Sequence, residues 1–196
     1  MVPPYEVSVF INCPFDDDFN PFLDAILLAA VACGLDPRSP DELGPWHPKP
    51  RLERIQDLMK ASKYSIHDLS RLRGEGDDNF ARMNMPFELG MARGLWLSDP
   101  ARDMIVLTDT TYDLPVALSD LGGLDVLPYG SDPSLMLRRL VGQFAFWPGA
   151  TDIDPNRLLP LLPEVHAANG AVREEYEMRH WKKMLLAVDG IVKRRL

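Results

Sequence analysis

Short apolar runs alternate with longer helical segments along most of this chain, and this alternation limits the possible folds more than any other feature. The expected strands are residues 7–12, 35–39, 64–69, 104–108 and 126–129, and the expected helices are residues 19–34, 51–62, a helix containing Pro86, and 131–144. Strands that alternate with helices favour a parallel sheet with right-handed crossovers. We therefore predict an α/β fold, namely a flavodoxin-like (Rossmannoid) five-stranded parallel sheet in the order 2-1-3-4-5.

The composition changes near residue 147 and divides the chain into two predicted parts. Residues 1–147 are expected to form the α/β domain, and residues 148–196 a C-terminal helical extension. Its first part, 148–164, is rich in proline and predicts an extended connector. From 171 to about 192, apolar residues recur at helical spacing and predict one amphipathic helix. That apolar face can pack on the domain or on a second copy of the chain, so self-association to a homo-oligomer is one expectation.

The charge balance argues against nucleic-acid polymers as partners. The chain has 196 residues with 21 Lys and Arg against 29 Asp and Glu, a formal net charge of −8. Phosphate-backbone binding therefore lacks its usual electrostatic driving force. The two cysteines have no CxxC spacing and suggest neither zinc nor a disulfide framework. We expect a cytoplasmic protein without a membrane span, because no signal-peptide pattern and no run of ~18 apolar residues is present.

The segment RMNMPFELG, residues 82–90, places a carboxylate near the start of a predicted helix. Pro86 suits the first helical position, so we expect Glu88 in the first turn, where the helix dipole favours its ionised form. Met85 and Phe87 would partly exclude water from this carboxylate. An ionised, partly desolvated carboxylate can act as a nucleophile. The alternative is that Glu88 only caps the helix.

Parallel strands bring their carboxyl ends to the same edge of the sheet, and three polar segments fall at that edge. They are the end of the first strand, the end of the third strand and the start of the Pro86 helix. In the order 2-1-3 the first and third strands are neighbours. We therefore expect Asn12, Asp68, Ser70 and Glu88 to share one small pocket.

Other polar residues allow two interpretations each. Asp16, Asp17 and Asp18 are of a type that binds Mg²⁺, but acidic residues just before a helix more often cap it, so we predict no metal site. Cys13 and His67 form a possible nucleophile pair, although we expect both to pack in the interior. Arg71 and Arg73 could hold a phosphate or simply form a solvated loop. Trp46 could stack on a base or cover the sheet edge.

The motifs INCPFDDDF, SKYSIHDLSR and NMPFELGMA together resemble the nucleoside 2-deoxyribosyltransferase-like superfamily, which is related to TIR domains. The resemblance spans roughly residues 7 to 145. It implies that Glu88 attacks the anomeric carbon of a nucleoside or nucleotide and that Asp68 holds the sugar. The chain also resembles a bacterial group with CPF and NMPFELG signatures, whose members are mostly uncharacterised and suspected of roles in antiphage defence.

The resemblance implies an N-glycosidase that cleaves or transfers the base of a nucleoside, nucleotide or NAD-like molecule without a cofactor. Arg82 and Asn84 stand where transferases of this kind often carry an acidic residue, so hydrolysis or an altered substrate is favoured over deoxyribosyl transfer. The expected substrate-binding residues are Asn12, Pro14, Phe15, Ser70, Asn84 and Met85. The alternative function is a catalytically silent sensor of a nucleotide-derived signal, with a defence protein as a possible partner.

Overall fold

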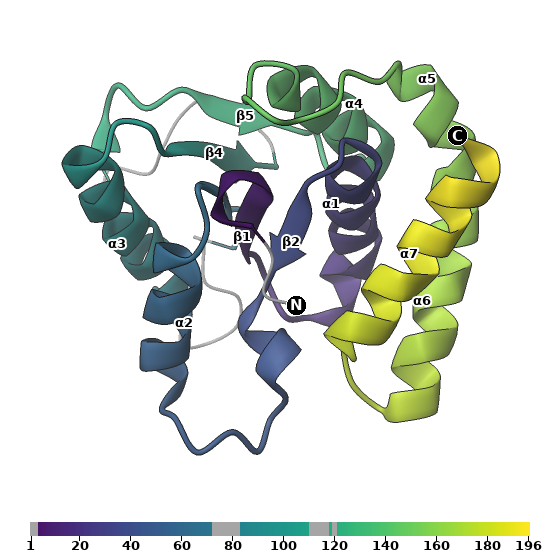
Figure 1. The fold of residues 1–196 in the computed structure, drawn as a ribbon, viewed down its shortest axis with the longest axis horizontal. Coiled ribbons are helices and arrows are strands. Elements are labelled where there is room, and N and C mark those ends of the chain that lie inside the picture. Colours follow the sequence, from purple (N-terminus) through teal and green to yellow (C-terminus); the bar gives the residue numbers. More distant parts are fainter. Residues whose placement is uncertain (1–3, 72–82, 110–117, 119–120) are drawn as a thin grey trace, which may run out of the picture.

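The computed structural model describes residues 4–71, 83–109, 118 and 121–196 and contains a five-stranded parallel sheet between helices (Figure 1). The strand order β2-β1-β3-β4-β5 confirms the predicted flavodoxin-like arrangement. The strands are β1 (Ser8–Asn12), β2 (Asp36–Arg38), β3 (Tyr64–Asp68), β4 (Asp103–Thr108) and β5 (Val126–Pro128). The α-helices are α1 (Asn20–Ala32), α2 (Arg51–Lys60), α3 (Asn84–Ser98), α4 (Pro133–Phe144), α5 (Pro155–Leu158), α6 (Leu162–Tyr176) and α7 (Trp181–Arg195). Short 3₁₀ turns include η2 (Asp17–Phe19) and η3 (Pro40–Leu43).

The register of the sheet brings the ends of four strands together at one edge. Asn12 is aligned with His67, Asp68 with Leu107, and Thr108 with Pro128. In a parallel sheet these residues all lie at the carboxyl edge, where the following loops and helix starts surround them. The polar residues that end β1 and β3 are therefore neighbours, as the strand order predicted.

The two faces of the sheet have separate cores because side chains alternate along each strand. Val9 and Ile11 of β1 point into the core that contains α1 and α4. Phe10 points the other way, into a smaller core with Ile55 of α2 and Ala92 of α3. Figure 1 shows α2 and α3 on one side of the sheet and α1 and α4 on the other.

The C-terminal part differs from its prediction. Residues 148–164 contain α5 and the start of α6, where the sequence predicted an extended connector. The predicted single helix of 171–192 is two helices, α6 and α7, separated at residues 177–180. The apolar stripe of α7, which includes Trp181, Met184 and Val188, is buried in the core around α1. No helix in the described ranges has both the length and the apolar character that crossing a membrane requires.

Candidate functional site

Asp68 ends β3 and is fully buried. Its Oδ1 accepts hydrogen bonds from the backbone N–H of Ser70, at 2.9 Å, and from the Ser70 hydroxyl. Its Oδ2 has no hydrogen-bond partner in the described part of the chain. Burial raises the pKa of Asp68 to about 6, although polar contacts with Ser70 and Tyr129 lower it. The site therefore offers one buried carboxylate oxygen that can still accept a hydrogen bond.

Tyr129 directly follows β5, and its hydroxyl lies close to the Asp68 carboxyl group. Its ring is buried, and desolvation together with the nearby Asp68 charge raises the pKa of its hydroxyl. The hydroxyl therefore stays protonated and can donate a hydrogen bond at this edge of the sheet. Sequence reasoning missed Tyr129, although its position at the end of a predicted strand is the signal that could have identified it.

Glu88 lies in the second turn of α3, whereas the sequence predicted it in the first turn. The helix starts at Asn84, so Pro86 is its third residue and Glu88 its fifth. Glu88 is 7% exposed, and no hydrogen bond or ion pair to another described residue reaches its carboxyl group. Burial raises its pKa to about 7, and the charge of Arg51 opposes that shift only partly. Desolvation thus outweighs the helix dipole, which was expected to favour the ionised form.

The helix-capping alternative for Glu88 does not fit this position. The N-cap residue of α3 is Met83, which makes no side-chain capping hydrogen bond, and the first turn holds no acidic residue. Glu88 is therefore a largely buried residue whose carboxyl group has no structural partner among the described residues, an arrangement that favours a functional role.

Asn12 connects β1, β3 and the start of α3. Its Nδ2 lies 3.1 Å from Nδ1 of His67 and donates to the backbone carbonyl of Met85, also at 3.1 Å. Because Nδ1 of His67 faces this donor, the ring is the neutral tautomer with its proton on Nε2, and burial lowers its pKa to about 3. His67 is thus an interior residue, as predicted. The Asn12 carbonyl oxygen is buried and has no partner among the described residues.

Cys13, directly after β1, is a buried thiol. Desolvation raises its pKa, the charge of Arg179 opposes this shift, and the charges of Asp68, Asp41 and Glu88 add to it. A thiol with a raised pKa is a poor nucleophile, so Cys13 serves as packing in the core. The contacts of Asn12 bring together the ends of β1 and β3 and the start of α3, and the region outside these strand ends is called the crevice below.

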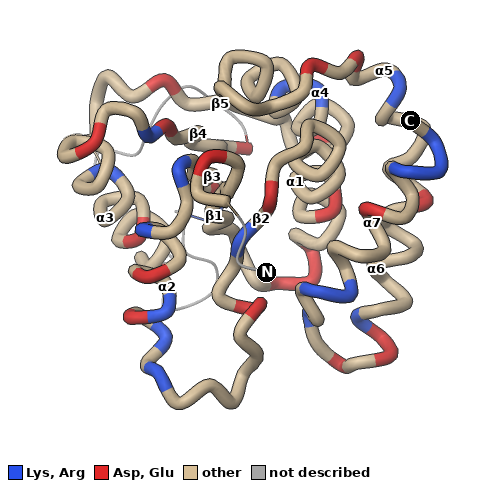
Figure 2. The backbone as a smooth tube through the Cα atoms, in the orientation of Figure 1, with Lys and Arg blue, Asp and Glu red and all other residues tan. Residues whose placement is uncertain are grey.

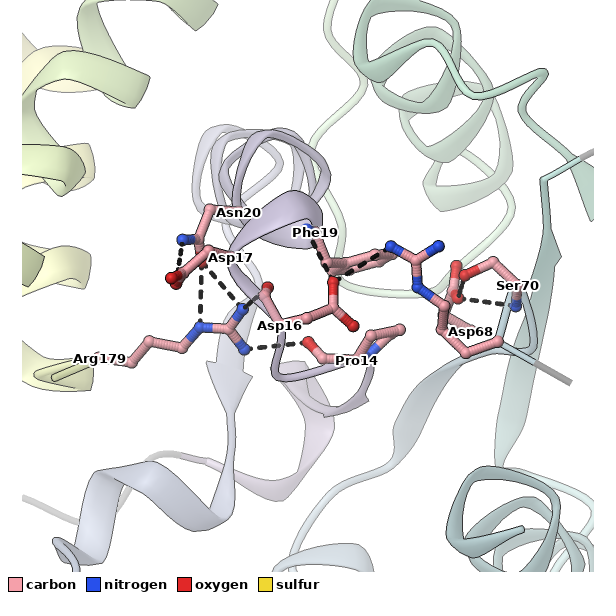
Figure 3. Close-up of polar contacts among 9 residues, drawn as sticks. Pro14, Asp16, Asp17, Phe19, Asn20, Asp68, Ser70 and Arg179 are labelled. Carbon is pink, nitrogen blue, oxygen red and sulfur yellow. Dashed lines mark hydrogen bonds and ion pairs between the residues drawn. The ribbon is translucent and has the colours of Figure 1, made fainter. Parts of the chain in front are cut away.

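The loop after β1 is held by an arginine from the C-terminal helices (Figure 3). Arg179 lies between α6 and α7 and donates to the backbone carbonyls of Pro14 and Asp16, both at 3.0 Å. It also donates to the Asn20 side chain at 2.9 and 3.1 Å. Its guanidinium carbon lies 5.4 Å from the centre of the Phe15 ring, and Arg51 lies 4.8 Å from the same ring.

The remaining candidates have more local roles. Pro14 is buried, whereas Phe15 is 38% exposed between the guanidinium groups of Arg51 and Arg179. The Met85 side chain packs in an apolar cluster with Leu69, so only its backbone carbonyl takes part in the polar site. Asn84 is exposed at the first position of α3.

The structure assigns local contacts to Asp16 of the acidic segment and to Arg71. Asp16 caps η2 by accepting from the backbone N–H of Phe19, as predicted. Arg71 donates to the same Asp16 carboxylate at 3.2 Å, which favours a loop contact over a phosphate-binding role. Arg73 lies outside the described residues.

Trp46 is 95% exposed, so it does not cover the sheet edge. Among the described residues no group of acidic, histidine or cysteine side chains is arranged to hold a metal ion.

A cavity lies beside the loop that Arg179 holds. This cleft of about 970 Å³ runs between the start of α1 and the C-terminal helices, with Phe15, Asp18, His166 and Glu177 among its walls. Neither Asp68 nor Glu88 lines it. The cleft therefore does not include the two carboxyl groups.

Comparison with known proteins gives no match: no protein-family model and no curated protein matches this chain.

Proposed function

We propose that the crevice at the carboxyl edge of the sheet binds a nucleoside, nucleotide or NAD-like molecule and that Glu88 takes part in breaking its N-glycosidic bond. The observation that carries the proposal is the state of Glu88, which is 7% exposed and has no hydrogen bond or ion pair to another described residue. A structural carboxylate is normally paired when buried, whereas a reactive one must keep its oxygens free. The resemblance of the surrounding motifs to nucleoside 2-deoxyribosyltransferases supports the same role.

Breaking an N-glycosidic bond places positive, oxocarbenium-like charge on the anomeric carbon of the sugar. The ionised Glu88 carboxylate stabilises this charge, or forms a bond to the carbon as the carbon–nitrogen bond breaks. The base leaves with the bonding electron pair and takes up a proton. Water then attacks the glycosyl ester, which releases the free sugar and restores Glu88. A pKa of about 7 leaves a large fraction of Glu88 ionised at neutral pH.

Asp68 has a complementary role as an acceptor for sugar hydroxyl groups. Its Oδ2 is buried and has no hydrogen-bond partner in the described ranges, while Ser70 occupies Oδ1 and fixes the orientation of the carboxyl group. A buried acceptor without a donor is costly unless a ligand supplies one. Asn12 Oδ1, at the end of the neighbouring strand, is a second buried acceptor of this kind. The pair favours a ligand rich in hydroxyl donors.

The test is to incubate the wild-type protein with nucleosides, nucleoside monophosphates and NAD and to follow the free base by chromatography. We expect the wild type to release base from one class of compound. Glu88→Gln removes the charge and keeps the shape, so it should lower turnover by orders of magnitude while substrate binding, measured by calorimetry, is largely retained. Glu175→Gln is the matched control, because Glu175 is exposed on α6, which packs on the opposite face of the sheet from α3.

The outcomes separate the two functions that the sequence suggested. Base release that survives in Glu88→Gln contradicts the role of Glu88. Binding of one compound without any release by the wild type favours a sensor of that molecule. If the wild type neither binds nor cleaves any compound of the panel, this result contradicts the proposal.

A further inference from the structure

An apolar groove lies between α7 and the segment that runs from the end of α1 into β2, beside the buried stripe. It has a volume of about 460 Å³ and is bounded by Val31, Leu35 and Pro37 on one side and by Leu185 and Leu186 of α7 on the other. Leu186 is 65% exposed. The stripe of Trp181, Met184 and Val188 is buried within the chain and Leu185 packs partly against the same core, so Leu186 is the groove residue that the chain itself leaves most exposed.

Two opposite charges bracket the apolar part of the groove. Lys182 lies one turn before the leucines and Asp189 one turn after them, and both line the groove. Positions 182, 185, 186 and 189 follow the i, i+3, i+4, i+7 spacing that places side chains on one face of a helix. From the N-terminal to the C-terminal end of α7, this face therefore carries a basic residue, two leucines and an acidic residue.

This pattern is complementary to itself when two copies of α7 run antiparallel. A two-fold axis midway between Leu185 and Leu186 sets each Lys182 opposite Asp189 of the other copy and stacks the leucines in the centre. We propose that this groove is the interface of a symmetric homodimer, in which Leu186 of each copy enters the groove of the other. An interface related by a two-fold axis uses the same patch on both copies, which this charge order allows.

The surroundings of α7 agree with the proposed pairing. Figure 2 shows basic residues gathered at the C-terminal end of α7. Arg194 pairs with Glu164 of its own chain at 3.2 Å, so the proposed pairing does not use it. Asp189 already pairs with Lys193 of its own chain at 2.7 Å, and a carboxylate accepts more than one donor. The contact between Lys182 and Asp189 of the two copies therefore does not require the Asp189–Lys193 pair to break.

The test is sedimentation of the full chain over a wide range of concentration. We expect the wild type to form a dimer that dissociates on dilution. Leu186→Glu should shift the protein to monomer, and its fold should persist because the side chain is mostly exposed. Lys182→Glu alone and Asp189→Lys alone should each weaken the dimer several-fold or more, because each change acts at two symmetric contacts. The double variant Lys182→Glu/Asp189→Lys should recover most of the affinity.

Lys60→Glu is the matched control, since it makes the same charge change at an exposed site on α2. A wild-type protein that is monomeric at every concentration overturns the proposal. A dimer that persists in Leu186→Glu also overturns it, because another surface then holds the copies together. Failure of the double variant to recover affinity overturns the antiparallel pairing. The proposal does not depend on the proposed function of the crevice.

Discussion

At the scale of single residues, the crevice holds two carboxyl groups whose charges are costly to bury. Asp68 is fully buried and Glu88 nearly so, and in both cases desolvation is the main cause of the raised pKa. A group whose pKa is raised by folding favours the protonated form in the folded state. The stability associated with Glu88 is therefore present below its ordinary pKa of 4.5 and is lost as the pH rises through about 7.

Glu88→Gln should stabilise the protein at alkaline pH, because it removes a charge that the fold buries without a partner. The gain at pH 8 should be at most about 3 kcal/mol, from the difference between a pKa of about 7 in the folded chain and 4.5 in the unfolded chain. It should shrink to well under half by pH 5. Denaturant unfolding at both pH values measures the change. An equal effect at both values would contradict the assigned burial cost, and Glu175→Gln should show little effect at either.

The residues of the candidate site could be predicted from the sequence only where they end a strand. Asn12 and Asp68 end β1 and β3, so the strand order alone places them side by side. The ionisation of Glu88 was predicted wrongly, because helix position is visible in the sequence and desolvation by the rest of the fold is not. Arg179 was missed for a related reason: it reaches Pro14 across 165 positions, and no local pattern indicates that contact.

At the scale of elements, the loop between β1 and α1 depends on the turn between α6 and α7. Arg179 donates to two backbone carbonyls of this loop and to the side chain of Asn20. Its planar guanidinium presents its donors in a fixed fork, which a lysine cannot reproduce. The C-terminal helices thus hold the loop that carries Phe15.

Arg179→Lys should loosen this loop while leaving the sheet intact. Hydrogen exchange of residues 13–19 should become faster, and the protein should lose about 1–3 kcal/mol of stability, the typical range for lost hydrogen bonds to a charged group. Arg138→Lys, an exposed position on α4, is the matched control. Unchanged exchange in the loop of Arg179→Lys would show that the loop holds its shape without the arginine.

The strands and most helices were predictable because their hydrophobic periods are regular, but the break between α6 and α7 was not. The apolar spacing continues across the turn from Tyr176 to Trp181, so the pattern reads as one helix. The chain turns at Glu177, which has a left-handed φ of 50°. Glycine is the residue that usually marks such a position, and here the sequence carries none there. Packing around α1 thus determines a turn that local propensity does not indicate.

At the scale of the whole molecule, the C-terminal helices belong to the same core as the sheet. Leu158, Val165, Trp181 and Met184 pack in one cluster with residues of α1 and β1. In addition, Asp24 of α1 is completely buried and binds three residues of α6: His166 at 2.7 Å, Asn169 at 2.8 Å, and Arg173. A carboxylate buried this deeply requires these partners, because an uncompensated buried charge is strongly destabilising.

A chain that ends at residue 147 should therefore fail to fold as a cooperative unit. The truncation exposes the side of α1 that α6 and α7 cover and leaves Asp24 without the three partners on α6. Thermal unfolding followed by circular dichroism should show one transition for the full chain and none for the truncated one. A chain that ends at residue 192 is the control, since it loses only exposed residues. A cooperative transition in the shorter chain would instead show that residues 1–147 fold as an independent domain and that the C-terminal helices only dock on it.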